Sequence, residues 1–159
     1  MTDTIERSQT HATFVLERTF PAPLAAVWHA LSDANARDQW FGGGAEFSTD
    51  EKSHDFRIGG QSVEDGQWHG GPRSRFAATY TDIVPEQRIV FTYDMWQDQR
   101  HLSTSVTTIV LEPVANGTHL TYTEQGVHLD GLDSVEGREA GTGGLLDQLA
   151  AFLARGGGR

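Results

Sequence analysis

The feature that most limits the fold of this chain is a run of four long strand-like segments joined by short turns. β-branched and aromatic residues are frequent along 75–84, 88–95, 102–112 and 118–125, which favours β-strands. One of the breaks between them contains Asn116-Gly117, a strong hairpin signal. Consecutive strands joined by such turns form an antiparallel meander.

A strand and two short helices are predicted before this run. Residues 13–20 have a strand pattern in which Phe14, Leu16 and Phe20 share a face that Arg18 interrupts. After Pro21-Ala22-Pro23, apolar residues with helical spacing indicate a first helix, and residues 34–39 indicate a second helical turn. The apolar stripe of the first helix comprises Leu24, Val27, Trp28 and Leu31.

The segments around the long strands have weaker signals. Residues 45–49 and 53–58 are interpreted as a hairpin, and Gly59-Gly60 as a turn. Residues 61–73 are rich in glycine and polar side chains, which favours a short strand followed by a mobile loop. Residues 126–136 are interpreted as a long connection.

The chain is expected to end in a long amphipathic helix that begins between Ser134 and Thr142, with Asp133 or Ser134 as its N-cap. Glycines at 141, 143 and 144 weaken its first half by about 1 kcal/mol each relative to alanine. Its apolar face, which we expect to be buried against the sheet, comprises Leu145, Leu146, Leu149, Phe152 and Leu153.

These elements predict an α+β domain in which a curved antiparallel sheet of about six to seven strands surrounds the C-terminal helix. Two short helices follow the first strand. The 159 residues favour one domain, which we place at 13–155. Residues 1–12 and 156–159 are expected to be flexible tails.

Charge and cysteine content exclude several functions. The formal net charge is −10, which disfavours nucleic acids and anionic membrane surfaces as partners. The chain has no cysteine, so disulfides, thiolate metal sites and a cysteine nucleophile are excluded, and a cytoplasmic location is expected. The histidines lack metal-ligand spacing, so neither a metal site nor a cofactor is predicted.

The sequence contains more aromatic side chains than a minimal core requires. They are interpreted either as ordinary core or as the lining of an apolar ligand pocket between the sheet and the last helix. The candidate pocket residues are Trp40, Phe41, Phe56, Phe76, Tyr80, Phe91, Tyr93, Tyr122, Glu124, Leu145 and Leu149.

Glu124 is the candidate with the most distinctive chemistry. Alternation from Leu120 through Tyr122 places its carboxylate on the same strand face as these apolar side chains. There it would anchor a ligand or act as a general acid or base with a raised pKa. Two alternatives stay open: the strand has already reached solvent, or Glu124 pairs with Arg18 or Arg138.

Several short segments along the chain match the pattern of a known family. They are Phe20-Pro21-Ala22-Pro23, Val27-Trp28, Trp40-Phe41, 82–90, 117–126, 129–131, Arg138-Glu139, Gly141-Thr142 and 145–149. Together they resemble the SRPBCC (START-like, helix-grip) superfamily, over about residues 13–153. The similarity is closest to its branch named for the activator of heat-shock protein 90 ATPase homologue.

The resemblance implies a cavity under the last helix. Members of the superfamily bind lipids, sterols or polyketides, and some are cyclases or dehydratases. We therefore predict binding of a small hydrophobic or amphipathic molecule. The alternatives are a polyketide cyclase/dehydratase-like or hydrolase-like enzyme that uses Glu124, and a chaperone ATPase cofactor; a homodimer stays open. We expect no stimulation of a chaperone ATPase, because the acidic chain offers no basic patch for docking on an acidic partner.

Overall fold

The computed structural model describes residues 6–157 and contains one seven-stranded antiparallel sheet with the strand order β1-β7-β6-β5-β4-β3-β2. In chain order, the elements are β1 (Gln9–Phe20), α1 (Leu24–Ser32), α2 (Ala34–Asp38), the 3₁₀ turn η1 (Gly44–Glu46), β2 (Phe47–His54), β3 (Gln61–Trp68), β4 (Arg73–Val84), β5 (Arg88–Gln97), β6 (Arg100–Val114), β7 (Gly117–Leu129) and α3 (Val135–Ala154).

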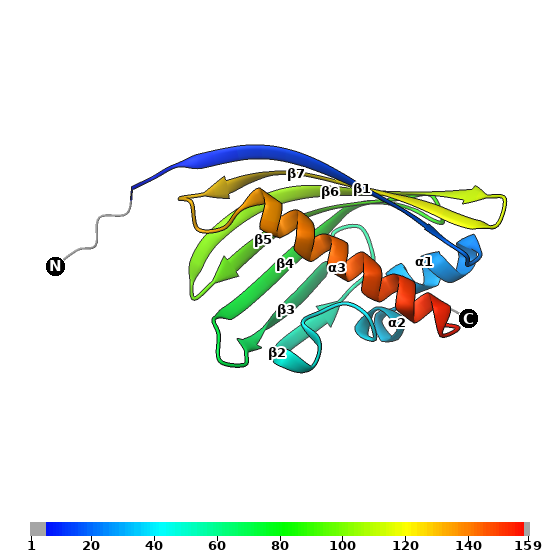
Figure 1. The fold of residues 1–159 in the computed structure, drawn as a ribbon, viewed down its shortest axis with the longest axis horizontal. Helices are drawn as coiled ribbons and strands as arrows, with labels where there is room; N and C mark the ends of the chain where they lie inside the picture. The colour runs from blue at the N-terminus through cyan, green and yellow to red at the C-terminus, as the bar shows by residue number, and fades with distance from the viewer. Residues whose placement is uncertain (1–5, 158–159) are drawn as a thin grey trace.

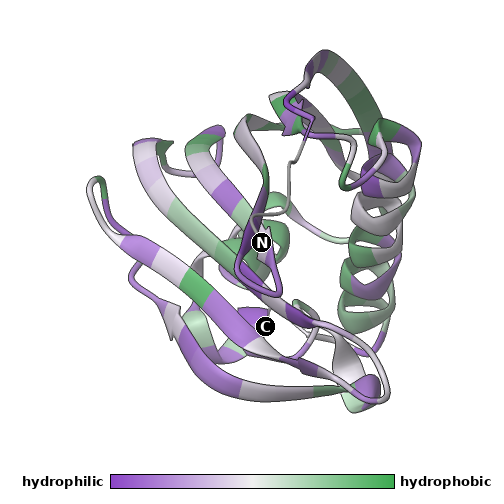
Figure 2. Ribbon diagram, turned by 90° about the vertical axis from the view of Figure 1, so that its left-hand side faces the viewer, coloured by the Kyte–Doolittle hydropathy of each residue, from purple (hydrophilic) through white to green (hydrophobic). Residues whose placement is uncertain are grey.

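The sheet curves around α3, which crosses its inner side, while α1 and α2 lie near the C-terminal end of α3 (Figure 1). Seen from the end of the molecule, the strands bend around one side and the helix stands opposite them (Figure 2). This arrangement confirms the predicted α+β helix-grip class. Among residues 6–157, no helix is long and apolar enough to cross a membrane.

The predicted hairpins of the meander are confirmed. Each pair from β4 to β7 is antiparallel and joined by a short turn. The turn between β5 and β6 contains Asp98 and Gln99, both with positive φ, as in two-residue hairpin loops whose twist matches that of the strands. Gly117 begins β7 at a point where a Cβ would collide with the carbonyl oxygen of Phe20, so only glycine fits there.

The predicted hairpin within residues 45–58 is wrong. Residues 47–54 form a single edge strand, β2, which pairs with β3 and has a register shift between Thr49 and Glu51. Most of its side chains are exposed, so the charged residues that suggest a turn are compatible with a strand at the edge of a sheet.

Two further expectations need correction. The segment 61–73 contains the eight-residue strand β3, which buries Ser62 and Glu64, and only residues 69–72 form a turn. Most of the expected loop is therefore strand, and part of its polar composition reflects inward-facing polar groups. The segment 126–136 continues β7 as far as Leu129, which pairs with Gln9 of β1. β1 therefore begins at Gln9, within the predicted tail. The rest of that prediction falls partly on residues 1–5 and 158–159, which lie outside the described residues.

The predicted helices are confirmed. α1 buries Val27 and Leu31 as its spacing indicates. α3 begins at Val135, and the backbone N–H of Gly137 donates to Ser134 Oγ at 3.0 Å, so Ser134 is the N-cap.

The solid core lies between the C-terminal half of α3, α1 and the sheet. Leu146, Leu149, Phe152 and Leu153 are buried there with Phe20, Val27 and Leu120 among others. Leu145, predicted to be buried with them, is only half-buried because it borders a cavity at the other half of the helix.

Candidate functional site

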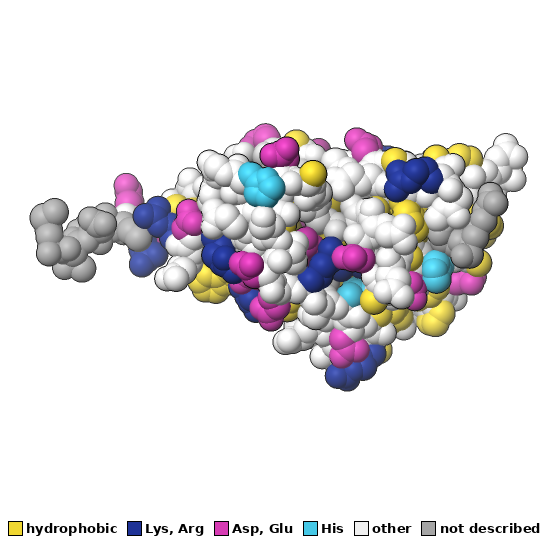
Figure 3. Space-filling model, turned by 90° about the horizontal axis from the view of Figure 1, so that it is seen from below, with side chains coloured by type: hydrophobic (Ala, Val, Ile, Leu, Met, Phe, Trp, Pro, Cys, Tyr) yellow, Lys and Arg dark blue, Asp and Glu magenta, His cyan; other side chains and the backbone are white. Residues whose placement is uncertain are grey.

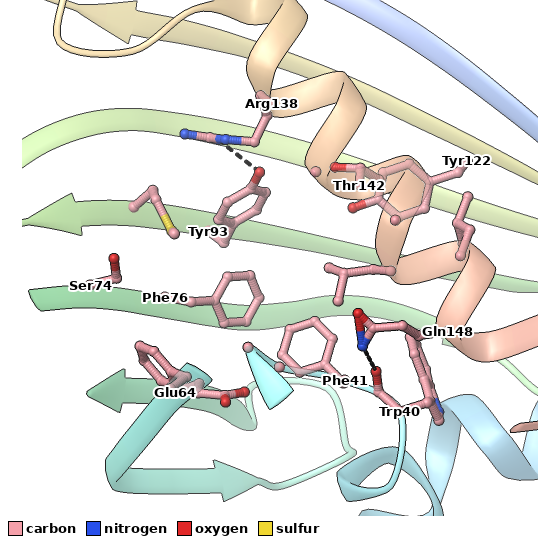
Figure 4. A pocket seen from close by; sticks show the side chains of 18 of the residues that line it. Trp40, Phe41, Glu64, Ser74, Phe76, Tyr93, Tyr122, Arg138, Thr142 and Gln148 are labelled. Atoms are coloured by element: carbon pink, nitrogen blue, oxygen red, sulfur yellow. Dashed lines mark hydrogen bonds between the residues drawn. The ribbon is translucent and has the colours of Figure 1, made fainter. Parts of the chain in front are cut away.

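A cavity of about 640 Å³ lies between the N-terminal half of α3, the strands and the segment that follows α2 (Figure 4). This volume is within the range of small-molecule pockets. The residues that contribute to its wall are Leu31, Arg37, Trp40, Phe41, Gly42, Gly43, Phe47, Glu64, Trp68, Ser74, Phe76, Tyr80, Ile89, Phe91, Tyr93, Met95, Gln97, Leu102, Ile109, Tyr122, Asp133, Ser134, Gly137, Arg138, Gly141, Thr142, Gly144, Leu145, Leu146 and Gln148.

Glycines of α3 contribute to this space. Arg138, Gly141, Thr142 and Leu145 follow one another at helical spacing and all line the cavity. A Cβ placed on Gly141 or on Gly144 would meet no atom within 4 Å. The absent side chains therefore leave volume that a longer residue would fill, at the cost of weaker helix propensity.

The opposite wall is aromatic. The ring of Phe41 lies 5.3 Å from that of Phe76, which in turn lies 5.0 Å from Tyr93. The series continues through Phe91, 6.1 Å from Tyr93, to Tyr80 at 5.8 Å. These rings form a continuous apolar surface suited to a flat or extended apolar molecule.

One segment of this wall is attached directly to α3. Gln148 Nε2 donates to the carbonyl oxygen of Trp40 at 2.8 Å (Figure 4). The indole of Trp40 is buried and donates to the carbonyl oxygen of Ala30 at 2.9 Å. These two bonds hold the chain next to Phe41 between α1 and α3.

Eight of the eleven candidate residues lie on the cavity wall: Trp40, Phe41, Phe76, Tyr80, Phe91, Tyr93, Tyr122 and Leu145. The other three do not. Phe56 packs against Trp28 and Tyr80. Leu149 is completely buried in the core. Glu124 lies on the predicted strand face but is covered by Tyr93.

Glu124 is part of a buried polar network. The Tyr93 hydroxyl donates to its carboxylate, with 2.9 and 2.8 Å to Oε1 and Oε2, and Ser105 Oγ donates to Oε2 at 3.2 Å. Arg138 Nη1 lies 3.7 Å from Oε2 and donates to Tyr93 Oη at 2.9 Å. Of the two open alternatives, pairing with Arg138 is the one that the geometry supports.

Arg138 links this network to the start of α3. Its Nη2 donates to Ser103 Oγ at 2.8 Å and to Asp133 Oδ2 at 2.6 Å. Asp133 also lies 2.8 Å from His128 Nδ1 through its other oxygen. The guanidinium is therefore well supplied with acceptors.

Burial raises the pKa of Glu124, although the Tyr93 hydrogen bond and the Arg138 charge act in the opposite direction. Burial and the nearby Glu124 also raise the pKa of Tyr93. For Arg138, burial alone would lower the pKa, but Tyr93, Asp133 and Glu124 together raise it. Because Glu124 does not border the cavity, any acid–base action on a bound molecule would have to pass through Tyr93.

Two charged residues of the wall, Arg37 and Glu64, were missed by the sequence analysis. Both are buried, with 8% and 7% of their surface exposed. Charged side chains on a short helix and in a polar strand are normally solvated. The composition of these segments therefore does not indicate that the two residues are buried. The sequence offers one weak signal for Arg37, which is its position about one helical turn before Trp40-Phe41.

His54 lies behind Tyr80, with its Nδ1 3.1 Å from the Tyr80 hydroxyl. Burial, assisted by the Arg37 charge, lowers the pKa of His54 from 6.5 to about 4. The unfolded chain therefore binds this proton more readily, and folding stability should decrease as the pH falls from 6.5 towards about 4. We expect His54→Gln to flatten this part of the profile in urea unfolding experiments; an unchanged profile would contradict the assignment.

Comparisons with known proteins agree with the fold and the family resemblance. A model of the family described as Activator of Hsp90 ATPase homolog 1-like protein matches residues 21–154. A solved structure from Rhizobium leguminosarum is 39% identical, covers 94% of this chain and 99% of its own, and has a TM-score of 0.90. One from Rhizobium loti is 49% identical, with coverages of 91% and 98% and a TM-score of 0.80. No curated protein matches the chain.

DynU16, a protein of the dynemicin biosynthetic locus, has the same fold at 22% identity and a TM-score of 0.64, over 91% of this chain and 48% of DynU16. A structural similarity at this low sequence identity shows the fold alone and says nothing about function. The family model and the two rhizobial structures, in contrast, span almost the whole domain. The chain therefore belongs to the Activator of Hsp90 ATPase homolog 1-like family.

Proposed function

We propose that this protein binds a small hydrophobic or amphipathic molecule in the cavity under α3. The observation that carries the proposal is the cavity itself, about 640 Å³ in volume and lined mainly by apolar and aromatic side chains. Pockets of this size with a few polar groups are typical of small-molecule sites.

The position of the polar groups also supports binding. Arg138 lies at one side of the cavity and Glu64 at the other, with the rings of Phe41, Phe76 and Tyr93 between them (Figure 4). An amphipathic molecule would place its apolar body against the rings and its polar group towards a charged residue of the wall. START-like proteins commonly hold hydrophobic ligands, which agrees with this proposal.

An enzyme that uses Glu124 is less well supported. Glu124 is 2% exposed and its oxygens already accept hydrogen bonds from Tyr93 and Ser105, so no oxygen of the Glu124 carboxylate reaches the cavity.

The expectation that the chain does not stimulate a chaperone ATPase stays a prediction. The face seen in Figure 3 mixes acidic and basic side chains and has no region of one sign on which to dock an acidic partner.

The proposal is tested by filling the cavity. We expect Gly141→Leu to weaken binding of the neutral fluorophore N-phenyl-1-naphthylamine by at least about tenfold, because the new side chain occupies the open space next to Arg138. The same change replaces a helical glycine and should raise stability by about 0.5–1 kcal/mol. Fluorescence titration and urea unfolding measure the two effects.

Ala140→Leu is the matched control, because Ala140 is the exposed neighbour of Gly141 on α3 and contributes nothing to the wall. It should leave fluorophore binding unchanged. Equal effects of the two substitutions, or no saturable binding by the natural chain, would contradict the proposal. As an independent test, native mass spectrometry before and after denaturing extraction would show whether a small molecule co-purifies with the protein.

A further inference from the structure

Arg37 is a buried cation without an ion-pair or hydrogen-bond partner among residues 6–157. It lies on α2, lines the cavity and is 8% exposed. Within residues 6–157, no carboxylate oxygen lies within 4.0 Å of its guanidinium, and no acceptor receives a hydrogen bond from it. Burial lowers the pKa of Arg37. Tyr80, Glu64 and Tyr122 raise this pKa, but only by electrostatic interaction through space.

Arg138, which lines the same cavity, differs from Arg37 in having protein acceptors for its guanidinium N–H groups. Its guanidinium donates to Tyr93, Ser103 and Asp133. A buried charge is costly unless it is paired and hydrogen-bonded. Arg138 meets that condition within the protein, whereas Arg37 does not.

One contact holds the Arg37 guanidinium in place. Its Cζ lies 3.7 Å from the centre of the Phe41 ring, within the range of cation–π interactions. Stacking of this kind uses the flat face of the guanidinium and leaves the N–H groups at its edge free to donate. Phe41 also lines the cavity, so the stacked pair is part of the ligand-facing wall.

Glu64 does not fill the role of a partner. Its Oε2 lies 3.8 Å from Lys52 Nζ, and Lys52 also pairs with Asp38 at 2.5 Å. Lys52 therefore partly compensates the Glu64 charge from the side of β2. Glu64 interacts with Arg37 only beyond ion-pair distance, which leaves the guanidinium edge unpaired.

We propose that the molecule bound in the cavity carries a carboxylate, which pairs with the guanidinium of Arg37. A carboxylate matches the two parallel N–H donors of an arginine and compensates a buried positive charge. The apolar part of the molecule lies along the rings next to Phe41. This inference rests on the proposed function and specifies the chemical class of its ligand.

The test compares three molecules with the same alkyl chain and different head groups. Displacement of N-phenyl-1-naphthylamine from the full chain measures the binding of dodecanoate, dodecanol and dodecylamine. The titrations are done at pH 8 and below the critical micelle concentration of each molecule. We expect dodecanoate to bind roughly 10- to 100-fold more tightly than dodecanol, the usual range for a charge-assisted hydrogen-bonded pair. Dodecylamine should bind more weakly than dodecanoate, because its charge repels that of Arg37.

Arg37→Met should remove the preference for dodecanoate and leave dodecanol binding within about twofold. Arg37→Lys, which keeps the charge without the planar fork, should retain part of the preference. Arg18→Met is the matched control, since Arg18 lies outside the cavity wall and pairs with Asp147. The melting temperature of Arg37→Met should not fall, because the substitution removes an unpaired buried charge.

The outcomes separate the two proposals. Equal binding of dodecanoate and dodecanol by the natural chain would overturn the role of Arg37 and leave the apolar pocket intact. The same holds for a preference that survives in Arg37→Met. If neither the fluorophore nor any of the three molecules binds saturably, the proposed function itself fails. The comparison within the natural chain needs no variant, so poor folding of Arg37→Met would not prevent the test.

Discussion

Replacing Leu149 with alanine is expected to reduce the free energy of unfolding by about 2–5 kcal/mol. Leu149 is completely buried in the cluster that joins α3 to α1 and the sheet. Removing its side chain leaves a void that rigid neighbours such as Phe20 and Leu120 cannot fill, so both transfer free energy and contacts are lost. Equilibrium unfolding in urea measures the change.

Leu145→Ala is the matched control, because it truncates the same residue type one turn earlier on the same helix. Leu145 is half-buried and borders the cavity, so its removal enlarges an existing space. We expect less than about half of the loss seen for Leu149. A loss below about 1 kcal/mol for Leu149→Ala would mean that α3 is not the central element of the core.

Replacing Arg138 with methionine is expected to cost about 3–5 kcal/mol at neutral pH, the usual effect of breaking a buried ion pair. The substitution leaves Glu124 without its neighbouring cation and removes the hydrogen bonds to Tyr93, Ser103 and Asp133. Unfolding at pH 7 measures the loss. The exposed pair of Arg88 and Asp82 provides a control, and Arg88→Met should cost less than about 1 kcal/mol.

The effect of Arg138→Met should depend on pH with a defined sign. The pKa of Glu124 is already raised by burial, so the folded state binds its proton more tightly than the unfolded state. The contribution of Glu124 to stability therefore decreases as the pH rises from the unfolded pKa through the folded one. Without Arg138 the pKa of Glu124 rises further. The loss of unfolding free energy caused by Arg138→Met should therefore be larger at pH 7 than at pH 5.

A double variant separates this effect from simple loss of packing. Glu124→Gln removes the carboxylate charge that Arg138→Met leaves unpaired. The double variant should therefore be more stable at pH 7 than Arg138→Met alone. The combined variant should also lose the extra pH dependence. If the deficit of Arg138→Met is the same at pH 5 and pH 7, Glu124 is not the group left unpaired.

The long strands and the last helix were predictable because their local signals agree with the final structure. Residues 75–125 have strand-forming composition broken by turn residues, and the leucines of α3 have helical spacing. The errors at β2 and β3 have one cause. Polar residues in a sequence indicate turns or loops, whereas Glu51 lies on an edge strand and Glu64 faces inward beside Lys52.

The amino-acid sequence by itself determined the class of fold, the face of α3 that packs in the core and most of the aromatic residues of the cavity. Periodicity and propensity are local properties, so they can be read along the chain. Only the tertiary structure decided that Tyr93 covers Glu124 and that Arg138 pairs with that carboxylate. It also decided that Arg37 lines the cavity without a partner in the described part of the chain. These facts depend on contacts between residues far apart in the chain, which no local pattern encodes.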